Sequence, residues 1–377
     1  MANVKAAVLT SPGQIEIREY PRPEVKPTDM LLKVEMAGVC GTDVHYYRGR
    51  EKALPYPIIL GHEFSVVIAE MGKNPYKLEP HGQELHVGDR VALFNTVTCG
   101  ECYFCRFTTR RGLCQNFFTW GITAKCKEPP YLYGGWAEYM YADQPKAWMY
   151  KLPKDMSAKL NVLVEPMTTA ARAFERAFAP GIPAFGEGFG PAKTVVIQGA
   201  GAIGTLSAAA AKISGAKKII MVGAPANRLK LAEKFGVDET INIEQITKPE
   251  ERIEIVRKLI RESQGPDVVV EATGVPAAVP EGLAMVRPGG SFVEVGHFVD
   301  TGAASINPFI MCSKDINLYG SYGYSEYDYE TAIHMLYYNR DRFPFEQLVT
   351  HEFPLAQAEK AILAAERGEA LKAAIVP

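Results

Sequence analysis

The chain has 377 residues, enough for two domains on the usual scale of about 150 residues each. Hydrophobic residues make up 47% and charged residues 22%, which excludes a disordered chain, and the net charge of −2 gives no basis for binding nucleic acid or an anionic membrane. No apolar run approaches the roughly 20 residues that span a bilayer, and the start lacks the apolar segment of a signal peptide. We therefore expect a soluble, cytoplasmic protein without nucleic-acid or membrane partners.

Short β-strands are predicted for the first part of the chain. Apolar and β-branched residues alternate with polar ones, between Pro and Gly breaks, at 4–10, 14–20, 29–39, 63–72 and 87–94. This pattern is typical of a β-rich, barrel-like region.

The pattern changes after about residue 160. Residues 163–178 have helical spacing, and a Gly- and Pro-rich connector follows at 179–193. From residue 194 to 297, uninterrupted Val/Ile strands alternate with helical stretches, which predicts a buried parallel sheet. The end of the chain is predicted to form helices at 329–339 and 353–368 and a last strand at 372–377.

A glycine-rich turn follows the first strand of this alternating part and opens a helix. Its residues are Gly199, Gly201, Ala202, Ile203 and Gly204. This context predicts a dinucleotide site, because glycines let the backbone approach a pyrophosphate at a helix N-terminus. NAD enzymes usually carry an acid about 20 residues further on, but Gly223 stands there. Arg228 could pair with a 2′-phosphate or lie along the adenine, so NAD and NADP both stay open.

Four of the seven cysteines lie within one loop: Cys99, Cys102, Cys105 and Cys114. In a reducing compartment, clustered cysteines favour a metal over disulfides. The spacing suits a tetrahedral zinc site better than an iron–sulfur cluster, whose last gap is three residues followed by Pro. Four protein ligands leave no open position, so we expect this zinc to be structural.

A second metal site is suggested by Cys40 in "GVCGTDVH" and His62 in "LGHEF". Alone, each would be read as a buried core residue. The cysteine loop and the dinucleotide turn in the same chain make a metal site at this thiolate and this imidazole the stronger hypothesis.

The chain resembles the zinc-dependent medium-chain alcohol and polyol dehydrogenases of the sorbitol and threonine dehydrogenase type. The likeness covers nearly the full length and rests on these two motifs, the cysteine loop, "VGDRV", "GGWAEY", "LVEP", "GAGAIG" and "KAAIVP". It implies an α/β fold with a GroES-like catalytic domain (1–164 and 326–377) and a Rossmann-type doubly wound parallel sheet domain (165–325).

The resemblance also implies roles for individual residues. A catalytic zinc is expected on Cys40, His62 and Glu165, and Glu63 is expected either to support these ligands without binding the zinc or to be an exchangeable ligand. Asp43 is expected to hold the ring N–H of His62. The implied reaction moves a hydride between a secondary alcohol or polyol, as its zinc-bound alkoxide, and a nicotinamide dinucleotide. A proton path through Thr42, the coenzyme ribose and His45 is implied as well.

Further coenzyme contacts are expected at the carboxyl ends of parallel strands: Thr273, Gly274, Gly296 and His297. Three features depart from the family pattern: an insertion at 73–87, the long connector at 179–193 and Gly223. The family likeness suggests a homo-oligomer, either a dimer or a tetramer.

Two other functions are possible for a chain with this fold. A zinc-free quinone or enoyl reductase on the same scaffold would lack the set Cys40, His62 and Glu165, which is present. A non-catalytic nucleotide-binding protein would be free to lose Thr42 and His45, and neither is lost. The dehydrogenase hypothesis predicts two zinc ions per chain, and the other two predict fewer.

Overall fold

The chain divides into two compact units in the computed structural model, which describes residues 3–51, 55–108, 110–143, 147–178 and 188–377. The first unit comprises Met1–Glu165, Ser325–Tyr337 and Phe345–Pro377, and the second comprises Pro166–Tyr324 and Tyr338–Pro344. In the second unit the Phe343 ring stacks on Phe235, with centroids 6.4 Å apart. The domain ranges 1–164, 165–325 and 326–377 stay a prediction.

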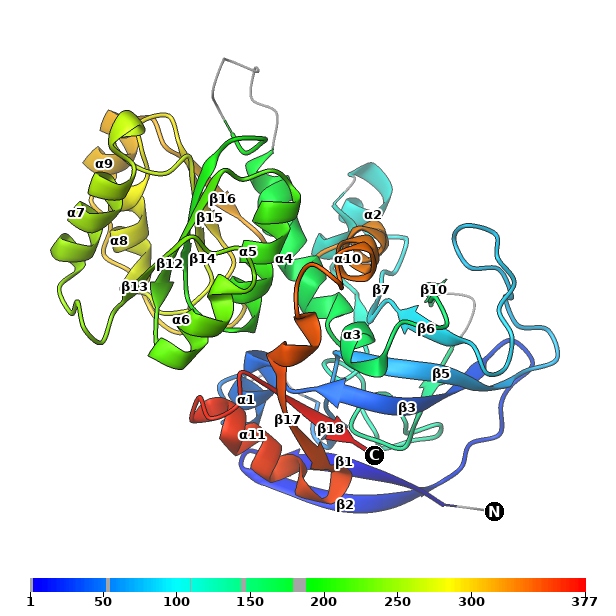
Figure 1. Ribbon diagram of the computed structural model, residues 1–377. Coiled ribbons are helices and arrows are strands. Elements are labelled where there is room, and N and C mark those ends of the chain that lie inside the picture. Colours follow the sequence, from blue (N-terminus) through cyan, green and yellow to red (C-terminus); the bar gives the residue numbers. More distant parts are fainter. Residues whose placement is uncertain (1–2, 52–54, 109, 144–146, 179–187) are drawn as a thin grey trace. The chain divides into compact units, whose positions relative to one another are not determined.

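The first unit is rich in short strands, as its alternating pattern predicts (Figure 1). Its strands are β1 (Asn3–Ser11), β2 (Gln14–Pro21), β3 (Met30–Gly38), β4 (Ile58–Ile59), β5 (Phe64–Met71), β6 (Arg90–Leu93), β7 (Thr96–Val97), β8 (Phe118–Thr119), β9 (Tyr139–Ala142), β10 (Met149–Lys151), β17 (Val349–Pro354) and β18 (Lys372–Val376). They form a sheet of order β2-β1-β4, a larger sheet of order β10-β6-β5-β3-β18-β17 with β9 paired to β3, and the pair β7-β8.

The last strand of the chain completes the larger sheet of the first unit. β18 runs antiparallel to β3, with Ala374 opposite Gly38, and the Val39 N–H donates to the Ala373 carbonyl at 2.9 Å. The start of β18 therefore lies beside the segment that leads from β3 into Cys40.

The helices of the first unit have nine residues or fewer, apart from one of 13 residues that begins at Glu326. They are α1 (Gly41–Tyr47), α2 (Tyr103–Phe107), α3 (Ala158–Asn161), α10 (Glu326–Tyr338) and α11 (Ala358–Glu366), with single turns at Arg111–Leu113, Phe345–Leu348 and Leu355–Gln357. α4 (Val164–Ala177) begins at the end of the first unit and continues into the second.

The second unit contains a six-stranded parallel sheet. Its strands are β11 (Thr194–Gln198), β12 (Lys218–Gly223), β13 (Glu239–Asn242), β14 (Val268–Glu271), β15 (Ser291–Glu294) and β16 (Asn317–Gly320). The order β13-β12-β11-β14-β15-β16 reverses between β11 and β14, which is the strand order of a dinucleotide-binding Rossmann fold.

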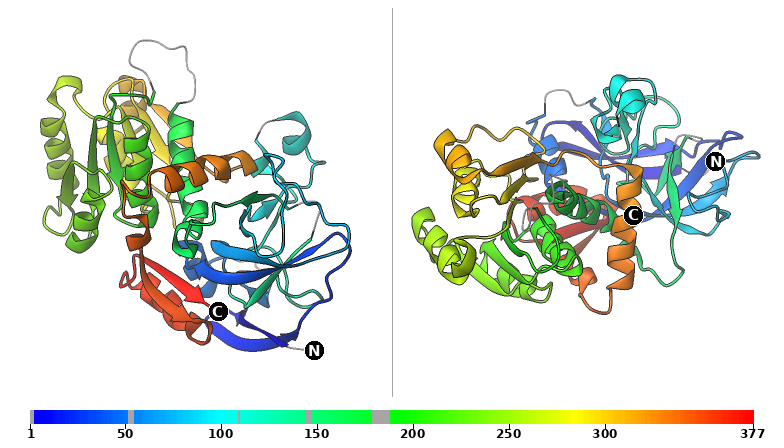
Figure 2. Two further views of the ribbon diagram at one scale, coloured as in Figure 1. Left: turned by 45° about the vertical axis from the view of Figure 1, so that its right-hand side comes forward. Right: turned by 90° about the horizontal axis from the view of Figure 1, so that it is seen from above.

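Helices cover both faces of this sheet. They are α5 (Ala202–Ile213), α6 (Ala226–Glu233), α7 (Pro249–Leu259), α8 (Ala278–Met285) and α9 (Pro308–Lys314), with a further turn at Arg261–Ser263. α5 and α6 lie on one face, and α7, α8 and α9 lie on the other (Figure 1, Figure 2). The predicted doubly wound parallel sheet is confirmed.

Candidate active site and metal centres

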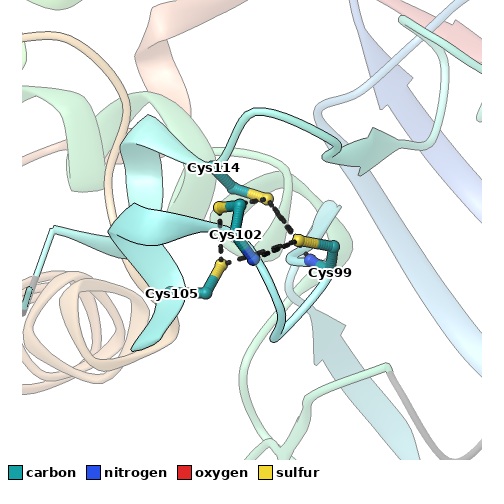
Figure 3. Close-up of side chains that lie close together, drawn as sticks. All are labelled: Cys99, Cys102, Cys105 and Cys114. Atoms are coloured by element: carbon teal, nitrogen blue, oxygen red, sulfur yellow. Dashed lines mark hydrogen bonds between the residues drawn. The ribbon is translucent and has the colours of Figure 1, made fainter. Parts of the chain in front are cut away.

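The four cysteines of the loop converge on one point. Figure 3 shows their sulfur atoms directed toward one another. The Sγ–Sγ distances are 3.5 Å for Cys102–Cys105 and Cys99–Cys114, 3.9 Å for Cys102–Cys114 and 4.0 Å for Cys99–Cys105. A disulfide needs about 2.05 Å, whereas four sulfurs at about 2.3 Å from a zinc ion lie about 3.8 Å apart. The geometry fits a tetrahedral zinc site.

Backbone N–H groups in this loop stabilise negative charge on the cysteine sulfur atoms. The N–H groups of Glu101 and Cys102 point at the Cys99 sulfur, each at 3.4 Å, and the Cys99 N–H points at the Cys114 sulfur at 3.3 Å. The backbone N–H of Gln115 lowers the pKa of Cys102 to about 6, whereas burial raises the pKa of Cys105 to about 12. Four thiolates together therefore require a cation.

A second group of potential ligands forms where two strands meet a helix. Cys40 is the N-cap of α1 directly after β3, and His62 and Glu63 directly precede β5. One ligand atom from each of these three residues lies within 4.8 Å of the others. The structure therefore brings together three of the four predicted ligands of the catalytic metal.

Two buried polar atoms beside this group lack hydrogen-bond partners among the described residues: His62 Nδ1 and Asp43 Oδ1. They face each other at 3.6 Å, while Asp43 Oδ2 accepts a hydrogen bond from the Cys40 N–H at 2.8 Å. Asp43 is thus anchored to one ligand and directed at the other. A metal on the opposite ring nitrogen of His62 would leave Nδ1 as an N–H donor toward Asp43, so these residues fit a metal site.

Glu165 lies in the first turn of α4 and is half-buried. Its side chain lines a small cavity with Phe64, Leu93, Asn161 and other residues of the first unit. Among the described residues, Glu165 is not part of the group within 4.8 Å. Its role as a ligand stays a prediction.

Lys372 is a site residue that the sequence analysis missed. Its Nζ lies 2.6 Å from both carboxylate oxygens of Glu63, and both side chains are buried, 5% and 1% exposed. The sequence does contain one indication of this pair: Lys372 is the only charged residue in the apolar segment "KAAIVP". A charge in a buried strand is nearly always paired, so a partner could have been expected.

The two residues of the predicted proton path lie on α1. Thr42 Oγ1 is 3.7 Å from Cys40 Sγ. His45 Nδ1 lies 3.0 Å from Arg50 Nη1, and burial together with the Arg50 charge lowers the pKa of His45. The neutral imidazole is therefore favoured.

The glycine-rich turn has the tight geometry that a pyrophosphate site requires. Gly199 has a φ of 110°, which favours glycine, and Gly201 is the N-cap of α5. A Cβ on Gly204 would overlap the Gly199 carbonyl. A Cβ on Gly223 would lie 2.8 Å from the Ala200 nitrogen, so this turn also excludes a carboxylate there. Ala202 and Ile203 open α5, and Arg228 lies on α6.

The predicted contacts Thr273, Gly274, Gly296 and His297 follow β14 and β15, at the carboxyl edge of the sheet. Two carboxylates, Glu271 and Glu294, lie beside His297. His297 Nδ1 lies 2.9 Å from Glu294 Oε1 and 3.5 Å from Glu271 Oε2. Burial raises the pKa of Glu271 to about 7.

The structure describes the whole insertion at 73–87 but only part of the connector at 179–193. The insertion at 73–87 packs within the first unit, where His81 Nε2 lies 3.3 Å from Glu330 Oε1 of α10. Of the connector at 179–193, residues 179–187 lie outside the described residues. No helix in the described part of the chain combines the length and the apolar content needed to cross a membrane.

Two family models match the chain. "Alcohol dehydrogenase GroES-like domain" matches residues 26–154, and "Zinc-binding dehydrogenase" matches residues 202–337. The chain is 32% identical over 374 residues to probable D-xylulose reductase A of Arthroderma otae, covering 98% of this chain and 96% of that protein.

Solved structures of dehydrogenases are also similar to this chain over its full length. An alcohol dehydrogenase from Thermotoga maritima is 30% identical with a TM-score of 0.91, covering 100% of both chains. A zinc-binding dehydrogenase from Sinorhizobium meliloti bound to NADP is 25% identical with a TM-score of 0.84, again over 100% of both chains. The predicted fold class, zinc dependence and nicotinamide coenzyme are confirmed. The chain belongs to the zinc-binding medium-chain alcohol and polyol dehydrogenases and is an NAD(P)-linked oxidoreductase.

Proposed function

We propose that this dehydrogenase interconverts a polyol and the corresponding ketose at the site formed by Cys40, His62 and Glu165. The observation that carries the proposal is the convergence of Cys40 and His62 beside two buried polar atoms without hydrogen-bond partners among the described residues. The D-xylulose reductase relative, similar over 98% of the chain, favours a ketose and its polyol over a simple alcohol.

Cys40, His62 and Glu165 would hold the catalytic zinc, and the four-cysteine loop would hold a second, structural one. When bound, the catalytic zinc supplies Lewis-acid chemistry, which lowers the pKa of an alcohol and polarises a carbonyl. Asp43 then fixes the orientation of His62 through the ring nitrogen that it faces.

The proton of the alcohol would leave by way of α1. Thr42 places a hydroxyl beside Cys40, and His45 is held as a neutral base by burial and Arg50. A neutral imidazole can accept a proton near neutral pH. Thr42 and His45 would be the two protein groups of this proton path.

The coenzyme would bind at the glycine turn, with Arg228, Thr273, Gly274, Gly296 and His297 as further contacts. Gly223 offers no carboxylate to repel a 2′-phosphate, so NADP is not excluded at this position. NAD and NADP must be compared directly.

We also propose a cytoplasmic homo-oligomer. None of the seven cysteines, all in the described residues, forms a disulfide, which suits a reducing compartment. Strand β16 lies at the edge of the parallel sheet with Leu318 49% exposed, and it would pair with its copy in a dimer or tetramer.

The test combines metal analysis with a substrate screen. The wild type should hold two zinc ions per chain and oxidise polyols with NAD or NADP. Cys40→Ser and Glu165→Ala should each lose about one zinc and all turnover while keeping a wild-type circular dichroism spectrum. A wild-type kcat in either variant would refute the site. One zinc in the wild type would favour a zinc-free reductase or a non-catalytic protein.

A further inference from the structure

The pair Lys372–Glu63 is a buried ion pair at the candidate active site. The ammonium sits symmetrically between the two carboxylate oxygens, at 2.6 Å from each, and approaches the Val39 carbonyl at 3.4 Å. Burying such a pair is costly, and replacing it with apolar residues is often neutral or stabilising. Stability alone therefore gives a weak reason for its presence.

The position of Glu63 suggests another reason. Its carboxylate belongs to the group within 4.8 Å that includes Cys40 Sγ and a ring nitrogen of His62. A divalent ion between Cys40 and His62 would therefore find Glu63 within reach as a ligand. If Glu63 bound that ion, it would take the coordination position that a substrate needs.

Two contacts hold Glu63 in place. Lys372 binds both of its oxygens, and Gly38 leaves room for the carboxylate, because a Cβ there would overlap Glu63 Oε2. Pairing of β18 with β3 sets the position of Lys372. The carboxylate can reach a metal only by giving up contacts with the ammonium.

The charges agree with this arrangement. Lys372 interacts electrostatically with Glu63, Cys40 and Glu165, which together carry three negative charges when ionised. One ammonium and one divalent cation neutralise these three charges. Without Lys372, the loaded site would keep one excess negative charge, and the metal would attract the freed Glu63 carboxylate more strongly.

We infer that Lys372 is a positioning residue that holds the Glu63 carboxylate off the active-site metal and so keeps one coordination position open for substrate. This inference rests on the proposed function, since it requires a metal at Cys40 and His62.

The test uses the full-length chain loaded with Co²⁺, whose visible spectrum changes when one ligand replaces another. Cys40→Ser gives the spectrum of the cysteine loop alone, which is subtracted. Lys372→Met should change the remaining spectrum and slow metal release to a chelator at least fivefold, as Glu63 becomes the fourth protein ligand. Turnover should fall in parallel.

Matched variants separate the position of Glu63 from the loss of charge. Lys372→Met/Glu63→Gln removes both partners and should restore the wild-type Co²⁺ absorption and release rate, because a Gln amide is a poor ligand. Lys372→Arg keeps the charge and should resemble the wild type. Should Lys372→Met not fold, Lys372→Gln, which removes the positive charge but keeps a polar side chain, carries the same expectation.

A wild-type Co²⁺ spectrum and release rate in Lys372→Met or Lys372→Gln would overturn the inference and leave the proposed function intact. Equal metal content in the wild type and Cys40→Ser would instead overturn the proposed function, and the inference with it.

Discussion

Replacing Glu271 with Gln should make the chain more stable at pH 8 but change its stability little at pH 5. Glu271 ends β14, is completely buried, and accepts hydrogen bonds from the backbone N–H and hydroxyl of Thr273. Its other oxygen faces the pair of Glu294 and His297. A Gln side chain can keep the bonds to Thr273 and donate its amide toward Glu294.

The magnitude follows from the titration of Glu271. Burial raises its pKa from 4.5 to about 7, and the repulsion of Glu294 adds to the effect. A raised pKa favours the folded state fully below 4.5, and this contribution is lost as the pH rises through about 7. At about 1.36 kcal/mol per pKa unit, the wild type loses about 2.5 kcal/mol between pH 5 and pH 8 relative to a variant that does not titrate.

Thermal unfolding at pH 5 and pH 8 measures the effect. For a domain of 150–250 residues, a change of 1 kcal/mol in stability shifts Tm by about 2–4 °C. The Tm difference between Glu271→Gln and the wild type should therefore be up to about 5–10 °C larger at pH 8 than at pH 5. Glu262→Gln is the matched control, because Glu262 is 90% exposed and its variant should show no such widening. A Tm difference for Glu271→Gln that is the same at both pH values would refute the reasoning.

Three other changes probe separate parts of the chain. Cys102→Ser should remove about one zinc and lower Tm, because the loop loses its metal link; an equally heat-resistant protein would contradict this. Arg252→Met should cost about 3–5 kcal/mol in urea unfolding, since it leaves Glu281, now bound at 2.6 Å and 2.7 Å, as a buried unpaired charge; Arg252→Met/Glu281→Gln should recover most of it. Gly204→Ala should abolish NADH and NADPH binding in fluorescence titrations without loss of zinc, because its Cβ overlaps the Gly199 carbonyl; unchanged Kd values would argue against this.

Local motifs were predictable from the sequence. The four cysteines lie within 16 residues and the glycine turn within six, so spacing alone indicates their chemistry. The parallel sheet was predictable as well, because buried strands are apolar throughout. The predicted helix at 353–368 was partly wrong: Val349–Pro354 forms β17, and the helix runs only from Ala358 to Glu366. β17 depends on pairing with β18, which a local pattern does not reveal.

Charged residues paired over long distances could not be predicted. Lys372 and Glu63 are 309 positions apart, and only the return of β18 to β3 brings them together. Likewise, Glu271 and Glu294 read as ordinary strand ends until parallel pairing of β14 and β15 sets them side by side. In both cases the sheet register, rather than any motif, creates the site.

Negative charges are crowded together both at Glu271 and Glu294 and at Cys40 and Glu63. The two clusters relieve this repulsion in different ways. In the second unit, Glu271 and Glu294 crowd two carboxylates, and the structure offers His297 and a raised pKa, so a proton can remove the excess charge. In the first unit, Cys40 and Glu63 already share Lys372, and the remaining negative charge suits a divalent ion. Proton uptake should therefore govern stability through the second unit, whereas metal removal should act on the first. A chelator should then lower Tm without altering the difference in pH dependence between the wild type and Glu271→Gln.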